Sequence, residues 1–78
     1  MNYSFIYLGN NTIYLQAGFS KLHDAREGLH SIVNLYCNNK GDKGIGKVTR
    51  HSLDKSVVVE EFKYIMKCKK LHISDKIV

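Results

Sequence analysis

The stretch KSVVVEEFKYIMKCKKLH, residues 55–72, decides the fold, because it lacks Gly, Pro, Asn and Asp and fits two different periods. In a strand, alternation would place Phe62 and Tyr64 on one face and lysines on the other. In a helix, a polar stripe running from Glu60 to Lys70 would lie beside apolar side chains. The choice between the two periods sets how many helices the protein has.

We predict the helix for this stretch. A strand of its length would exceed the usual run of about five or six residues, and its Glu, Lys and Met content favours a helix. The β-branched run Val57–Val59 favours the strand, which stays the alternative. Short strands are predicted on either side, over residues 46–51 and 71–74.

The first part of the chain predicts a β-hairpin. Runs of β-branched and aromatic residues, Tyr3–Leu8 and Thr12–Gln16, flank Gly9-Asn10-Asn11, whose residue types tolerate the positive φ of a tight turn. Alternation places the aromatic side chains of the first run on one face and its aliphatic side chains on the other. Because both faces are partly apolar, we expect the hairpin to be covered on one face and contacted on the other.

A helix is predicted after the hairpin. Apolar residues recur there at helical spacing, after Ser20 as the N-cap and before a stop at residues 38–41. These residues are Leu22, Ala25, Leu29, Ile32, Val33 and Tyr36. Gly28 inside the helix costs about 1 kcal/mol relative to Ala, and a close approach to the sheet or a partner would offset that cost.

These elements predict one small α+β domain over residues 1–78, a small antiparallel sheet packed with helices in the order ββαβα(β). The strand alternative gives ββα followed by further strands. A chain this short hides only roughly 60% of the surface that its unfolded form exposes. Such a thin core leaves little room for a deep active site, and it favours extra burial against a partner or in a homodimer.

Charge is distributed unevenly along the chain. Residues 1–19 carry no charged side chain, whereas residues 40–78 carry the whole net charge of +5. This asymmetry predicts an apolar structural half and a basic contact half. In the predicted second helix, lysines would form a ridge able to neutralise phosphates, and Glu60 would pair with Lys63. The candidate binding residues are Lys40, Lys43, Lys47, Arg50, Lys63, Lys67, Lys69 and Lys70.

The segment GDKGIGK, residues 41–47, matches the GxxxxGK part of a phosphate-binding P-loop. The match then fails, because Val48 replaces the Ser or Thr that would bind Mg²⁺ and the predicted helix precedes the loop instead of following it. We therefore exclude an NTPase. The glycines still suit a close backbone approach to a phosphate or to an acidic protein surface.

Three side chains on one face of the helix predicted after the hairpin have the spacing of possible metal ligands. His23, Glu27 and His30 stand at i, i+4 and i+7, and imidazoles with a carboxylate bind transition metals. The same spacing is typical of an ordinary solvated helix face, which we expect here. No metal and no other cofactor is predicted.

Arg50 and His51 suggest a further chemistry. A histidine that moves a proton, beside a basic group that stabilises the charged transition state, is the minimum for metal-free RNA cleavage. No second histidine or glutamate is spaced to complete an acid–base pair. The ordinary interpretation is a strand end followed by a cap at Ser52 or Asp54.

The cysteines and the N-terminal apolar run indicate the cellular compartment of the protein. Cys37 and Cys68 form neither a CxxC pair nor a disulfide framework, so both are predicted to be reduced and packed. The apolar run Phe5–Leu8 is too short to span a membrane, and no basic region precedes it as in a signal peptide. We predict a cytoplasmic protein without membrane contact. The excess of Lys over Arg is typical of AT-rich coding sequences, including those of phages and mobile elements.

No segment carries a specific catalytic signature, so function is predicted by elimination. The leading hypothesis is a non-catalytic binding protein, not an enzyme, whose Lys-rich second half contacts nucleic acid or the nucleic-acid-binding site of a partner protein complex. The alternative is a phage-type or mobile-element inhibitor that covers a surface of a host protein complex, such as a defence or transcription enzyme. A small metal-free RNase is the third hypothesis.

Overall fold

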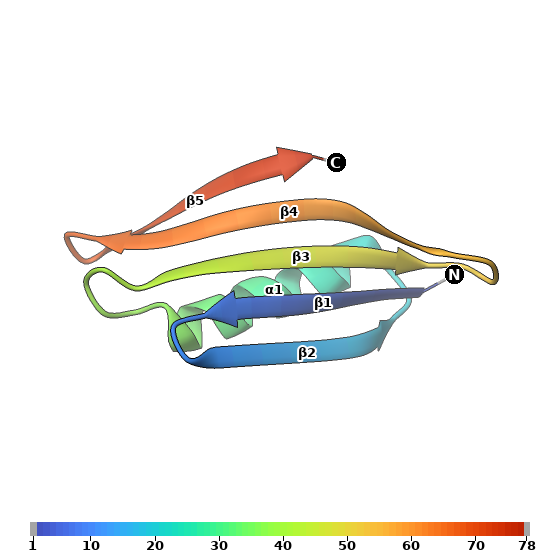
Figure 1. The fold of residues 1–78 in the computed structure, drawn as a ribbon, viewed down its shortest axis with the longest axis horizontal. Coiled ribbons are helices and arrows are strands. Elements are labelled where there is room, and N and C mark those ends of the chain that lie inside the picture. Colours follow the sequence, from blue (N-terminus) through green and yellow to red (C-terminus); the bar gives the residue numbers. More distant parts are fainter. Residues whose placement is uncertain (1, 78) are drawn as a thin grey trace.

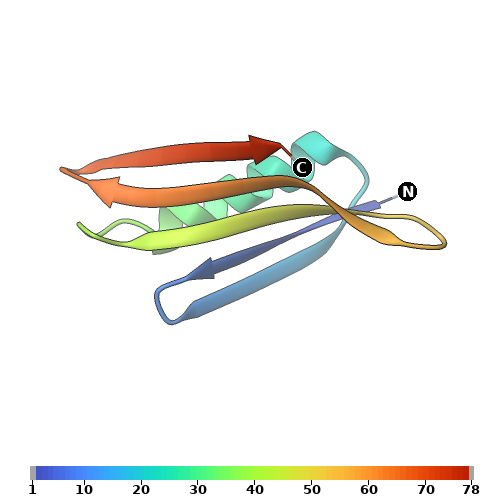
Figure 2. The same cartoon turned by 45° about the horizontal axis from the view of Figure 1, so that its top comes forward.

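The computed structural model describes residues 2–77 of the chain. They form a five-stranded sheet with one helix against one face (Figure 1). The strand order is β2-β1-β3-β4-β5, every neighbouring pair is antiparallel, and Figure 2 shows the helix crossing behind the middle of the sheet. The elements are β1 (Asn2–Gly9), β2 (Thr12–Phe19), α1 (Leu22–Tyr36), β3 (Lys43–His51), β4 (Ser56–Lys67) and β5 (Lys70–Ile77).

The predicted fold class, a small sheet packed with helices in the order ββαβα(β), is wrong. The protein is mostly β, and its described residues follow the order ββαβββ with a single helix. Residues 55–72, predicted as a helix, contain β4, the β4–β5 turn and the start of β5. β4 reaches 12 residues because it is hydrogen-bonded on both sides, to β3 and to β5.

Side-chain burial explains why β4 is a strand. Phe62 and Tyr64 point to α1 and are buried, while Lys63 and Lys67 alternate to the other face and are exposed. Each buried aromatic side chain contributes about 1.5–3 kcal/mol, whereas helix propensities of ordinary residues differ by at most about 0.7 kcal/mol. Burial of the alternating aromatic row therefore outweighs the helix preference of Glu, Lys and Met.

The N-terminal hairpin is confirmed. β1 and β2 pair around Asn10 and Asn11, and Asn11 has the positive φ, 56°, expected in a tight turn. The pairing shifts by one residue near Gly18, whose φ is 95°, so the end of β2 bends. The strand predicted over residues 46–51 is confirmed as part of the longer β3, and residues 71–74 lie within β5.

The first helix is also confirmed, with one correction. α1 covers the predicted apolar positions, but its N-cap is Lys21 instead of Ser20 and makes no capping side-chain hydrogen bond. Gly28 approaches the sheet closely, because a Cβ at this position would lie 3.0 Å from the Phe5 ring. The glycine thus lets the helix pack against β1.

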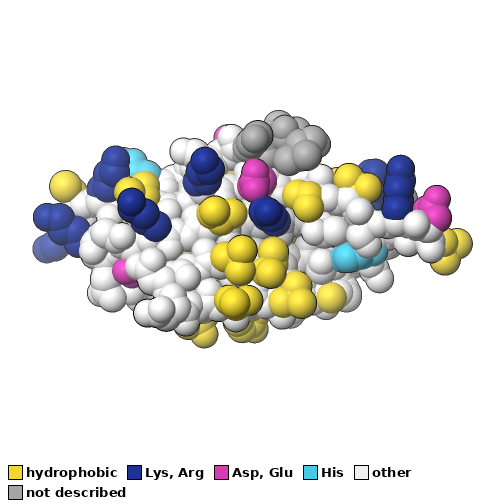
Figure 3. All heavy atoms as spheres, viewed as in Figure 1, with side chains coloured by type: hydrophobic (Ala, Val, Ile, Leu, Met, Phe, Trp, Pro, Cys, Tyr) yellow, Lys and Arg dark blue, Asp and Glu magenta, His cyan; other side chains and the backbone are white. Residues whose placement is uncertain are grey.

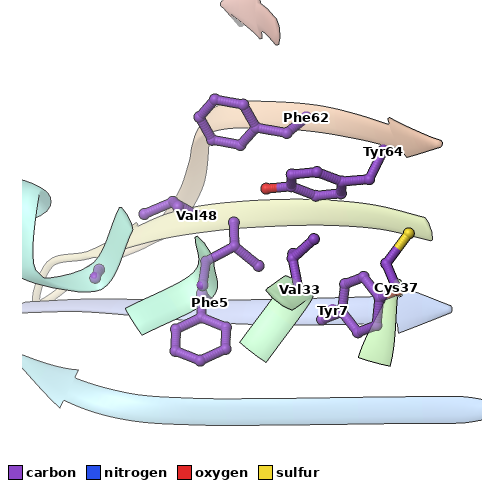
Figure 4. Packing of buried hydrophobic residues seen from close by; sticks show 9 residues of the cluster. Phe5, Tyr7, Val33, Cys37, Val48, Phe62 and Tyr64 are labelled. Carbon is purple, nitrogen blue, oxygen red and sulfur yellow. The ribbon is translucent and has the colours of Figure 1, made fainter. Parts of the chain in front are cut away.

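The core lies between α1 and the sheet face that it covers. Figure 4 shows side chains from β1, β3 and β4 pointing toward the helix. The buried residues are Phe5, Tyr7, Ala25, Leu29, Val33, Cys37, Val48, Phe62 and Tyr64. A Cβ at Gly44 would overlap the Tyr7 ring, and one at Gly46 would lie 2.8 Å from the methyl groups of Leu29. Two of the three glycines predicted to approach a phosphate, Gly44 and Gly46, therefore make room for the core, whereas a Cβ at Gly41 would meet no other atom within 4 Å.

The opposite face of the sheet, called the open face below, has no element over it within residues 2–77. Figure 3 looks onto this face and shows hydrophobic side chains gathered near its middle. They are neighbours across strands, since Leu8 pairs with both Ile13 and Ile45, and Ile6 pairs with Leu15. We define the aliphatic patch as Ile6, Leu8, Ile13, Leu15 and Ile45.

Candidate nucleic-acid interface

One end of the sheet gathers most of the predicted binding lysines. Lys43 begins β3, and the loop before it is tied to the end of β4 by 2.9 Å hydrogen bonds between Met66 and residues 41–42. Lys67 and Lys70 flank the β4–β5 turn and face each other at the same end. Figure 3 shows Lys side chains clustered there. We define the basic end as Lys40, Lys43, Lys67, Lys69 and Lys70.

Within the described side chains, no carboxylate forms an ion pair with the lysines of the basic end. Asp42 lies at this end, but its carboxylate accepts hydrogen bonds from the backbone N–H of Asn38 at 3.2 Å and of Asn39 at 2.9 Å, and from the Asn10 amide at 3.2 Å. Asp42 thus orders the loop that carries Lys40. The end of the sheet keeps a positive potential toward solvent.

The β4–β5 turn holds two side-chain-bearing residues in the left-handed region. Cys68 has φ 49° and Lys69 has φ 65°, values that a type I′ hairpin turn requires and that Asn and Gly adopt more readily. For other residues this conformation costs about 1–2 kcal/mol each. Cys68 is free and exposed, whereas Cys37 is free and buried, so the predicted packing holds for Cys37 only.

A hollow of about 480 Å³ lies beside the basic end on the open face. Ile45 and Ile65 line it together with Lys43, Lys63 and Ser74. An apolar surface bordered by ammonium groups suits a group that combines an apolar plane with a negative charge, as a nucleotide does. Aromatic rings are absent from the lining except at Tyr64, which is itself buried.

The remaining predicted binding residues lie outside the basic end. Lys63 and Lys47 lie on the open face near the middle of the sheet, and Lys47 Nζ is 3.7 Å from Glu61 Oε1. Arg50 alternates to the face of β3 that carries Val48, so it points away from the lysines of the open face. The structure therefore brings the terminal lysines together and separates Arg50 from them.

Glu60 has a different partner from the one predicted. It does not pair with Lys63, because the two residues do not share a helix. Its carboxylate accepts from Arg26, with Nε to Oε1 at 2.8 Å and Nη2 to Oε2 at 2.6 Å. This bidentate pair joins α1 to β4 across 34 positions of sequence, a separation that local periodicity does not detect.

The groups proposed for RNA cleavage do not converge. His51 Nε2 lies 2.7 Å from Ser4 Oγ, and His51 Nδ1 lies 2.7 Å from Ser56 Oγ, so both ring nitrogens are engaged across three strands. Arg50 points to the opposite face of the sheet, and Lys47 is beside Glu61. The geometry favours a role for His51 in joining β1, β3 and β4.

The residues with metal-like spacing also separate. His23 and Glu27 form an exposed pair, with 3.6 Å between Nε2 and Oε1. His30 turns toward the sheet, where its ring lies edge-on to Phe62 at a centroid distance of 5.2 Å, and burial lowers its pKa. Within the described residues, no group of three His, Cys, Asp or Glu side chains is arranged to hold a metal ion.

No protein-family model, curated protein or solved structure matches the chain. Across residues 2–77, no helix has the length and apolar content needed to cross a membrane. Sequence reasoning missed the hollow and the extent of the aliphatic patch. The signal for the patch was present, since Ile6, Leu8, Ile13 and Leu15 alternate with the core residues of β1 and β2.

Proposed function

We propose that the protein is a non-catalytic nucleic-acid-binding protein that contacts phosphates through its basic end. The observation that carries this proposal is the group of lysines at one end of the sheet, which form no ion pairs within the described side chains. Lysines that neutralise phosphates release bound counterions, and this release supplies affinity without base contacts. A cytoplasmic location, where Cys37 and Cys68 stay reduced, belongs to the same proposal.

The turn geometry supports a functional role for Lys69. A left-handed lysine next to a left-handed cysteine costs more than the Asn-Gly pair that this turn type favours. Backbone strain of this kind is retained at functional sites more often than elsewhere. Lys69 would project its ammonium group from the tip of the turn, beside Lys67 and Lys70.

The shape of the surface favours single-stranded nucleic acid. The hollow offers the aliphatic side chains of Ile45 and Ile65 to an unpaired base, while Lys43 and Lys63 lie close enough to meet its phosphates. A duplex read by a helix in the major groove does not fit, because α1 contains one Arg or Lys, Arg26, and Glu60 holds it. Contact along the backbone of a single-stranded nucleic acid fits this surface better than recognition of a duplex by a helix.

The test is fluorescence anisotropy with labelled single-stranded RNA and DNA oligonucleotides at low salt. The variant K67Q/K69Q/K70Q removes charge from the basic end, and we expect its affinity to fall about tenfold or more. The control is K21Q/K55Q, which removes two exposed lysines from the opposite end of the molecule. The same loss of affinity per removed charge in both variants would show that only net charge matters and would contradict a site at the basic end.

A protein target is the second candidate, supported by the aliphatic patch. Ile13 and Leu15 keep 76% and 66% of their surface exposed, which suits an inhibitor or adaptor that docks on a protein complex. Binding of that kind depends on buried apolar area and weakens little with salt. Binding that persists at high salt and is lost in L8S, which alters the aliphatic patch outside the lining of the hollow, would favour this second function.

A further inference from the structure

We infer that two copies of the chain associate through β2, joining their sheets edge to edge into one continuous antiparallel sheet. β2 and β5 are the edge strands. Folded proteins protect such edges with charged side chains or proline. β5 follows this rule with Lys70 and Asp75, but β2, TIYLQAGF, contains neither charge nor proline.

The direction of the backbone groups along β2 follows from the hydrogen bonds of the sheet. In an antiparallel pair, a residue directs its N–H and C=O to the same side, and successive residues alternate between sides. Met66 directs both groups to residues 41–42, on the β3 side of β4. Phe62, four residues earlier, therefore also directs its backbone N–H and C=O to β3, where its partner is Gly46.

The same alternation continues through the sheet to its edge. The backbone N–H and C=O of Gly46 are directed to β4, so those of Ile45 are directed to β1, where Ile45 pairs with Leu8. Leu8 directs its backbone groups back to β3. Its neighbour Tyr7 therefore directs them to β2, where it pairs with Tyr14. The residues on either side of Tyr14 direct their N–H and C=O away from the sheet. These outward residues are Ile13 and Leu15, followed by Ala17.

The outward backbone N–H and C=O groups of β2 can pair with the same groups of β2 in a second copy of the chain. A two-fold axis at Leu15 places Leu15 of one copy opposite Leu15 of the other, and Ile13 opposite Ala17. On the open face, apolar side chains then meet apolar side chains. On the α1 side, Tyr14 meets Gln16, and no like charges face each other along the strand.

Charge distribution favours a second copy over other pairings. Two molecules of net charge +5 repel each other over most of their surfaces, but residues 1–19 are uncharged and keep the lysines of both copies distant from the contact. Pairing of β2 with β5 of another copy would propagate into open filaments, and Lys70 and Asp75 oppose it. The bulge at Gly18 confines pairing to the first part of β2.

The test measures oligomeric state by sedimentation velocity over the micromolar range, with the full chain and no ligand. We expect a dimer for the wild type. Leu15→Pro removes an outward N–H that has no strand partner within residues 2–77 of the same copy, so the monomer fold is kept while pairing is blocked. We expect the dimer Kd to rise about tenfold or more, with an unchanged circular dichroism spectrum.

Two further variants keep the inference open to contradiction. If Leu15→Pro does not fold, Leu15→Lys places a charge at the same edge and is expected to give a monomer. Ile45→Lys alters the open face in a central strand and should stay dimeric, which separates edge pairing from face-to-face packing. A monomeric wild type, or a dimer that survives both Leu15 substitutions, would overturn the inference. Protection of the Ile13 and Leu15 amides from hydrogen exchange should rise with protein concentration.

Discussion

Gly46 sets how closely α1 packs on β3. A Cβ at this position would lie 2.8 Å from both terminal methyl carbons of Leu29 and 3.0 Å from the Tyr64 ring. We expect Gly46→Ala to lower the free energy of unfolding by about 1–3 kcal/mol, because these neighbours are buried and must shift. Urea denaturation measures the change. Asn34→Ala, on the exposed side of α1, is the control and should not destabilise the protein.

His30 should make stability depend on pH. Burial lowers its pKa in the folded protein, with Arg26 acting in the same direction and Glu27 and Glu60 opposing it. The unfolded chain, with a His pKa of about 6.5, then takes up the proton first. The stabilising contribution is present above about pH 6.5 and is lost as the pH falls below it.

The measurement compares the free energy of unfolding at about pH 7.5 and about pH 5 in wild type and His30→Gln. We expect the acid-induced loss to be smaller in His30→Gln. Asn34→Gln alters an exposed side chain of the same helix that does not titrate and should behave like the wild type. An equally steep loss in His30→Gln would show that other groups account for the pH dependence.

At the scale of elements, the β4–β5 turn lowers the stability of the fold, because it holds Lys69 and its neighbour Cys68 at positive φ. We expect the double substitution Cys68→Asn and Lys69→Gly to raise the free energy of unfolding by about 1–2 kcal/mol, because both positions have positive φ. The same variant should bind single-stranded RNA more weakly, since it lacks one ammonium group. Lys69→Gln keeps the left-handed side chain without its charge, so it should weaken binding without stabilising the fold. A turn variant that gains stability and keeps full affinity would remove Lys69 from the site.

Elements with local signals could be predicted from the sequence. The hairpin follows from Gly9-Asn10-Asn11 between two β-branched runs, and α1 follows from its apolar spacing. β4 could not be assigned, because its side chains satisfy both periods and only contact with α1 selects the alternating one. The wrong fold class follows from that single element, since a helix there would also have removed the partner strand of β5.

For the whole molecule, the distribution of charge was visible in the sequence but its geometry was not. The basic second half was expected, yet antiparallel turns decide which lysines meet. Lys43 and Lys67 lie far apart in sequence and reach one end of the sheet, whereas Arg50 lies close to Lys47 and points to the other face. The hollow needs three strands in register, which local patterns do not encode.

The salt dependence of nucleic-acid binding tests the central claim most directly. Plotted as log Kd against log salt concentration for a single-stranded RNA, each phosphate contact contributes a slope of about 0.7. Contacts from most of the basic end predict a slope of about 3, reduced by about 2 in K67Q/K69Q/K70Q and unchanged in K21Q/K55Q. No binding at about 50 mM salt, or a slope that the basic-end substitutions leave unaltered, would contradict the assignment of this surface to phosphates.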